Sequence, residues 1–91
     1  MNYLKIDIEN YLEYCRTQKR LDKKTLKAYR IDLHQFSGQI LITKCAEITI
    51  TILETYIAKL HQQYAPKTVK RKIASLKAFF HYLEYKEIIN Q

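Results

Sequence analysis

The sequence predicts an all-α fold, a compact four-helix bundle, on three observations. The 91 residues include one glycine and one proline, too few turn-forming residues for a β fold with many tight turns. Apolar residues make up 47% of the chain and recur at helical spacing, which excludes a disordered chain. This length is enough for one hydrophobic core and too short for two, so we expect a single domain over residues 1–91.

The first helix is expected over roughly residues 5–18. Ile8, Tyr11, Leu12 and Cys15 fall on one face of it. Acidic residues come early in this segment and basic residues gather at its end, an order that suits the helix dipole. Since Cys15 falls within the apolar stripe, we interpret it as a small core residue rather than a reactive thiol.

The second helix is expected to begin after Asp22, a residue type that favours the N-cap position. A regular apolar stripe follows it at steps of three and four, namely Leu26, Tyr29, Leu33, Phe36 and Ile40. Gly38 is expected to weaken or end this helix somewhere between residues 37 and 42.

The third helix is expected to follow residues 48–52, whose alternating Ile and Thr could also form a strand. We favour a helix start, because a single strand would have no partner elsewhere in the chain. Thr51 and Glu54 have capping-box spacing, and Thr49 is a competing cap. The helical period then continues through Leu53, Tyr56, Ile57 and Leu60.

The fourth helix has the clearest signals. Pro66 suits the first helical position, where its missing N–H costs nothing. An apolar stripe follows at steps of four and three, namely Val69, Ile73, Leu76, Phe80 and Leu83. These stripes are needed for the core of so small a domain, which argues against an interfacial membrane helix.

Basic residues are concentrated in two segments. The net charge of +7 favours a polyanionic partner. Residues 16–30 hold seven basic residues against one acid, and residues 67–83 hold five against none. The rest of the chain carries four basic and eight acidic residues. Such segregation is typical of a surface that binds a line of phosphates, although a solvated lysine face remains the alternative.

Each basic segment places its charges on a helical face distinct from its apolar stripe. One line comprises Lys23, Lys27, Arg30 and His34. The other comprises Lys70, Ala74, Lys77 and His81. The small side chains Ala74, Ser75 and Ala78 would let the fourth helix approach a groove closely.

The chain offers no convincing active site. Its histidines are isolated, metal-ligand spacing is missing, and one glycine cannot build a phosphate loop. Asp22 and Glu54 are better explained as caps than as general bases. We therefore expect no catalytic residue, metal, cofactor or small-molecule substrate. Tyr11, Tyr29, Tyr56 and Tyr82 are interpreted as core or rim residues, with the Tyr29 hydroxyl able to turn toward a phosphate.

Two widely spaced cysteines indicate a reduced, cytoplasmic protein. The N-terminus carries no signal segment, and the chain contains no apolar run of about 20 residues, so we expect no membrane partner.

Two stretches resemble a known family. Residues 21–36, LDKKTLKAYRIDLHQF, resemble the "LS–x–x–T–x–x–x–Y–x–x–D–L–x–x–F" run of phage-integrase-type tyrosine recombinases. Residues 65–83, APKTVKRKIASLKAFFHYL, resemble that family's "S–x–x–T–x–x–R–x–L–S–A–L–R–x–F–F–x–Y–L" helix. Ile48-Thr49 with Tyr56, Ile57 and Leu60 match the pattern between them. The ordered set covers nearly the whole chain.

The resemblance implies a SAM-like, four-helix core-binding domain, the N-terminal half of a clamp that closes around duplex DNA. In that family the second and fourth helices face the major groove and its flanking phosphates. The catalytic residues, including the nucleophilic tyrosine, belong to a separate C-terminal catalytic domain, so this chain would be a fragment whose interdomain linker begins at Asn90. The isolated domain is expected to be monomeric.

We expect most contacts to reach phosphates, with Lys70 and Lys77 as the candidates for base edges. Lys77 stands where arginine is common in the family, which favours a phosphate contact over guanine recognition. Asp22 and Ala65 replace the pattern's two serine caps. The expected DNA-binding residues are Lys23, Lys24, Thr25, Lys27, Tyr29, Arg30, Lys67, Thr68, Lys70, Arg71, Ser75 and Lys77.

Two other functions remain open at this point. A SAM-like protein–protein module would dock its basic helices on an acidic partner. A small helical DNA-binding regulator would bind duplex DNA without any part in recombination.

Overall fold

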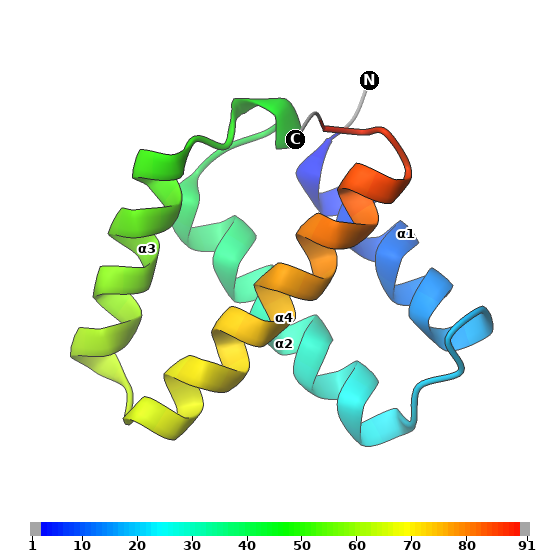
Figure 1. Ribbon diagram of the computed structural model, residues 1–91, viewed down its shortest axis with the longest axis horizontal. Coiled ribbons are helices and arrows are strands. Elements are labelled where there is room, and N and C mark those ends of the chain that lie inside the picture. Colours follow the sequence, from blue (N-terminus) through cyan, green and yellow to red (C-terminus); the bar gives the residue numbers. More distant parts are fainter. Residues whose placement is uncertain (1–2, 90–91) are drawn as a thin grey trace.

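A computed structural model describes residues 3–89, and this part of the chain is helical (Figure 1). Its α-helices are α1 (Leu4–Thr17), α2 (Lys23–Ile40), α3 (Ile50–Gln63) and α4 (Pro66–Tyr85), with a 3-10 turn, η1 (Cys45–Glu47), before α3. The β structure within residues 3–89 amounts to one isolated bridge between Tyr3 and Lys44. The predicted all-α, four-helix fold is confirmed.

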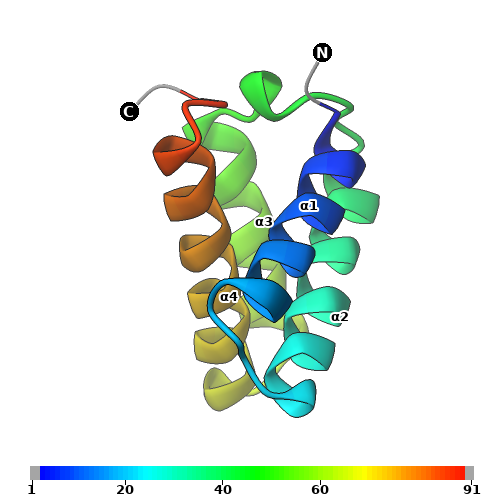
Figure 2. The same cartoon turned by 90° about the vertical axis from the view of Figure 1, so that its right-hand side faces the viewer.

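Helices α2 and α4 cross near the middle of the bundle, with α1 and α3 on either side (Figure 1). The turned view shows that α2 and α4 begin at the same end, drawn at the bottom of both pictures (Figure 2). Connections 18–22 and 64–65 lie there, whereas η1 and the starts of α1 and α3 lie at the opposite end. We call the shared end the basic end, defined by residues 19–27 and 67–70.

Two of the predicted helix starts are confirmed and one detail is wrong. The Asp22 side chain caps α2 by accepting a hydrogen bond from the Thr25 N–H at 2.8 Å. Thr49 caps α3 by accepting from the Ile52 N–H at 3.2 Å. The predicted Thr51–Glu54 capping box is therefore incorrect, because α3 already begins at Ile50.

The end of α2 lies within the predicted interval. The helix continues past Gly38 to Ile40. It ends where Leu41 adopts a left-handed conformation with φ of 55°. Gly38 therefore does not end the helix, because a glycine in one late turn costs only about 1 kcal/mol.

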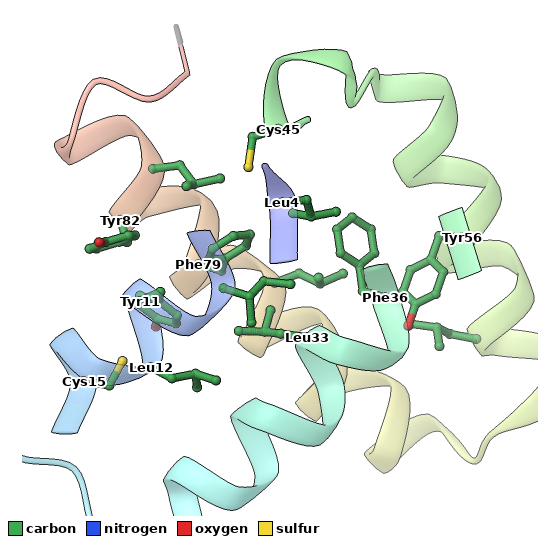
Figure 3. Close-up of a cluster of buried hydrophobic side chains, with 14 of the residues drawn as sticks. Leu4, Tyr11, Leu12, Cys15, Leu33, Phe36, Cys45, Tyr56, Phe79 and Tyr82 are labelled. Atoms are coloured by element: carbon green, nitrogen blue, oxygen red, sulfur yellow. The ribbon is translucent and has the colours of Figure 1, made fainter. Parts of the chain in front are cut away.

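Aromatic rings fill the centre of the core (Figure 3). The Tyr11 ring lies 5.0 Å from that of Tyr82 and 5.5 Å from that of Phe79, and the Phe36 ring lies 5.1 Å from that of Tyr56. Leu33 and Cys15, both fully buried, pack in the same cluster. The interpretation of Cys15 as a core residue is confirmed, as is that of the four tyrosines.

No helix within residues 3–89 combines the length and apolar character needed to cross a membrane. The linker start that the resemblance places at Asn90 lies outside the described residues.

Candidate nucleic-acid interface

Seven of the twelve predicted contact residues are lysines and threonines in the first two turns of α2 and α4, at the basic end. Five are exposed lysines and two are half-buried threonines. They are Lys23, Lys24, Thr25, Lys27, Lys67, Thr68 and Lys70. Two segments about 40 residues apart in the sequence thus present their positive charge at one end of the bundle.

The connection before α2 adds two cations that the predicted set omitted. Lys19 and Arg20 are exposed in the connection that leads into α2 at this end. The sequence already signalled them, since both belong to the basic segment 16–30. The predicted set was chosen from residues that follow the helix cap. Lys19 and Arg20 precede the cap, yet they lie at the same end of the bundle as the lysines that follow it.

The lysines of the candidate interface are free to bind an anion. Within residues 3–89 the basic partners of the ion pairs are arginines, His34 and Lys72. The lysines without an ion pair in this part of the chain include Lys23, Lys24, Lys27, Lys67, Lys70 and Lys77. The amino ends of two helix dipoles lie beside most of them and add positive potential. This combination of free lysines and helix amino ends attracts phosphate groups.

The two helix starts differ in their caps. The backbone N–H of Thr25 donates to Asp22, and this bond lowers the pKa of the Asp22 carboxyl. That carboxylate occupies the start of α2 and would repel a phosphate there. Ala65 gives α4 no side-chain cap, which leaves the N–H groups of Lys67 and Thr68 without a side-chain acceptor. A phosphate is therefore better accommodated at the start of α4 than at the start of α2.

Two predicted contact residues, Arg71 and Ser75, bind a buried carboxylate, Asp32 of α2. Arg71 donates to Oδ1 of Asp32 at 2.8 Å, and Lys72 donates to the same oxygen at 3.0 Å. The Ser75 hydroxyl, also buried, donates to Oδ2 at 2.9 Å. We leave Ser75 out of the candidate interface, because its hydroxyl faces Asp32 inside the bundle. Arg71 keeps half of its side chain exposed, 51%, and remains able to reach a phosphate.

This polar cluster extends to the start of α4. Lys72 also donates to Oε1 of Gln35 at 2.7 Å, and Gln35 donates to the Tyr64 hydroxyl at 2.7 Å. The Lys72 ammonium lies 5.0 Å from the centre of the Tyr64 ring. Since Tyr64 ends α3 and precedes Pro66, the cluster joins α2, α3 and α4 close to the basic end.

The remaining predicted residues of α2 lie against α1. The Tyr29 ring is half-buried and stacks on the Tyr11 ring at 6.3 Å. Arg30 donates to both carboxylate oxygens of Glu9, at 3.0 and 2.8 Å. Sequence reasoning missed this pair, because Glu9 and Arg30 are 21 residues apart.

Lys77 lies on the side of α4 that faces α3. It lines a shallow hollow of about 330 Å³ with Lys70, Ala74 and His61 of α3. Since α4 begins at Pro66, Lys70 lies close to its start, and Lys77 stands two turns farther along the helix.

The described residues offer little for covalent or metal chemistry. Burial raises the pKa of the Tyr11 hydroxyl, and it raises the pKa of Tyr56 to about 12, the opposite of what a nucleophilic tyrosine needs. Burial also raises the pKa of the Cys45 thiol, which donates to Asp7. Across residues 3–89, no three His, Cys, Asp or Glu side chains gather where a metal ion could be held.

Comparison with known proteins identifies the family. Residues 8–87 match the family described as "Phage integrase, N-terminal SAM-like domain". A tyrosine recombinase of Agathobacter rectalis is 62% identical over 91 residues, which is all of this chain and 30% of that relative. Tyrosine recombinase XerD of Listeria monocytogenes is 36% identical over 81 residues, covering 84% of this chain and 27% of the relative.

Tyrosine recombinase XerC of Oceanobacillus iheyensis is 30% identical over 88 residues, covering 92% of this chain and 29% of the relative. The chain thus spans less than a third of the length of these curated relatives. No solved structure matches it significantly. Because the match covers most of the chain, in agreement with the four-helix fold, this protein belongs to the family of phage integrase N-terminal SAM-like domains.

Proposed function

We propose that this chain is the core-binding domain of a site-specific tyrosine recombinase and that it binds duplex DNA through its basic end. In the parent protein it would hold the recombination core site for a separate C-terminal catalytic domain. The family supports the link to recombination. The observation that carries DNA binding is the gathering of exposed lysines from α2 and α4, without ion pairs within residues 3–89, at one end of the bundle.

Phosphate contacts supply most of the affinity in this proposal. Lysines are compact charges that bind phosphate oxygens without reading sequence. Each contact releases counterions and adds about 0.9 to the slope of log K against log salt. Lys70 is the candidate for a base contact, because the exposed Ala74 beside it lets α4 approach a groove.

The chain by itself supplies binding and positioning in this proposal, and bond cleavage belongs to the catalytic domain. The tyrosines Tyr11 and Tyr56 are covered by the core, so neither can attack a phosphodiester. Without the catalytic domain we expect a monomer that binds a duplex weakly and with strong salt dependence.

Charge reversal at the two ends of the bundle tests the proposal. Lys23→Glu combined with Lys67→Glu should weaken binding of a fluorescent duplex by at least about tenfold at low salt. The control combines Lys5→Glu with Lys86→Glu, two exposed lysines at the other end. Anisotropy titrations should show a much smaller loss for the control. Equal losses would mean that only the net charge matters and would contradict the proposed interface.

A further inference from the structure

Glu9 of α1 holds two basic side chains of α2 on the surface of the bundle. Nη1 of Arg30 lies 2.8 Å from Oε2 of Glu9, and Nε2 of His34 lies 2.6 Å from the same oxygen. About half of each Glu9 and Arg30 side chain is exposed, 48% and 54%. The cluster is therefore reachable from solvent, whereas the Asp32 carboxylate is buried, with a side chain 1% exposed.

Arg30 continues the line of free lysines that begins at the basic end. Lys23, Lys27 and Arg30 follow one another at steps of four and three, so they share one face of α2. Arg30 stands seven residues after Lys23, about 10 Å along the helix axis. The major groove of a duplex is about 12 Å wide, so a duplex docked on the basic end would bring flanking phosphates to the height of Arg30.

The Glu9 carboxylate offers Arg30 what a phosphate would offer. Both are anions with two oxygens that match the donors of a guanidinium group. Hydrogen bonds from His34 and Arg30 lower the pKa of the Glu9 carboxyl, because they stabilise its ionised form. His34 also fixes the carboxylate in place, so that Arg30 meets a preformed anion site.

We propose that Glu9 limits the DNA affinity of this domain by competing with backbone phosphate for Arg30. The inference rests on the proposed function, since it requires a duplex on the basic end. With Glu9 present, Arg30 stays paired, and the other basic residues of the interface contact phosphates without it. A lower non-specific affinity leaves a larger share of the binding free energy to contacts that recognise the base sequence of the site.

The test compares two carboxylates of the same helix. Glu13 also lies on α1, is exposed, and pairs with an arginine, Arg16, at 2.7 Å. Glu9→Gln and Glu13→Gln thus change the net charge equally, but only Glu9→Gln releases an arginine of α2. Binding of the 91-residue chain to a random-sequence fluorescent duplex would be measured across a salt series. A third variant, Glu9→Gln with Arg30→Gln, removes the released arginine.

Glu9→Gln should bind the duplex about two- to fivefold more tightly than Glu13→Gln at low salt. Its salt slope should be steeper by about 0.9, the signature of one added phosphate contact. The variant that also carries Arg30→Gln should lose both gains. A change in stability alone would alter neither the slope nor its dependence on Arg30.

Three results would overturn the inference. One is equal affinity and slope for Glu9→Gln and Glu13→Gln. Another is a gain that survives Arg30→Gln, and the third is a gain with an unchanged slope, since Arg30 would then contact phosphate already in the unaltered chain. Failure of the proposed function itself looks different, because the unaltered chain would then not bind the duplex at low salt.

Discussion

Two carboxylates bind basic side chains on opposite sides of α2, and their surroundings differ. Asp32 is almost entirely buried, with a side chain 1% exposed, and it accepts hydrogen bonds from Arg71, Lys72 and Ser75 of α4. The Glu9 side chain is 48% exposed and binds Arg30 and His34 of α2. Both carboxylates join two helices, yet solvent surrounds only one of them.

The difference in burial assigns the two carboxylates different roles. A buried charge that loses its partners costs several kcal/mol, so the Asp32 cluster fixes how α2 and α4 cross. An exposed pair contributes at most about 1 kcal/mol, so removing the Glu9 carboxylate releases Arg30 at little cost in stability. The buried Lys72 is thus part of the framework, whereas Arg71 and the Arg30 side chain bound to Glu9 keep about half of their side chains exposed.

Removing the buried carboxylate should have the largest effect. Asp32→Ala leaves Lys72 buried without its charged partner and should lower the free energy of unfolding by about 3–5 kcal/mol. Urea denaturation measures the loss. The variant that combines Asp32→Leu with Lys72→Met removes both buried charges and should recover most of the stability. Failure of this recovery would mean that the cluster acts through something other than its buried charges.

Removing the cap of α2 should have an intermediate effect. Asp22→Ala should destabilise the domain less than Asp32→Ala and more than Glu9→Gln, because a backbone N–H loses its acceptor. The folded-state pKa of Asp22 is depressed below 3.8. The ionised Asp22 cap therefore contributes its full stabilisation above about pH 3.8, and this stabilisation is lost as the pH falls through the folded-state pKa. Urea denaturation of both proteins at several pH values should show their difference shrink in acid, and a constant difference would exclude the charged cap.

Removing the exposed carboxylate should have the smallest effect on stability. Glu9→Gln should lower the free energy of unfolding by at most about 1 kcal/mol, and added salt should reduce this difference. The same denaturation measurement in low and high salt checks both statements. A loss comparable to that of Asp32→Ala would show that Glu9 is structural and would remove the contrast between the two carboxylates.

The sequence predicted most of the fold because local signals agree with one another. The apolar stripes of α2 and α4 predicted buried positions such as Leu33, Phe36 and Val69, and Asp22 predicted a helix start. Spacing could not decide between Thr49 and Thr51 as the cap of α3. Both are residue types that favour the N-cap position, and they stand two positions apart before the same apolar stripe. In the structure the Thr49 side chain caps α3 by accepting a hydrogen bond from the Ile52 N–H.

The candidate interface was predicted less completely. Charge segregation selected α2 and α4, whose starts share one end of the bundle, but it counted all cations alike. Whether a cation is free depends on partners distant in the sequence, such as Asp32 for Lys72 across 40 positions. Helical spacing likewise placed Ser75 close to a surface face, and only the crossing of α2 over α4 buries it.

The most direct test of the proposed interface is an NMR titration of the 91-residue chain with a duplex at low salt. We predict the largest backbone shift changes at residues 19–27 and 67–70, where α2 and α4 begin. Small changes are predicted at residues 44–50, on the opposite end of the bundle. Shift changes centred on residues 44–50, or no binding at low salt, would contradict it.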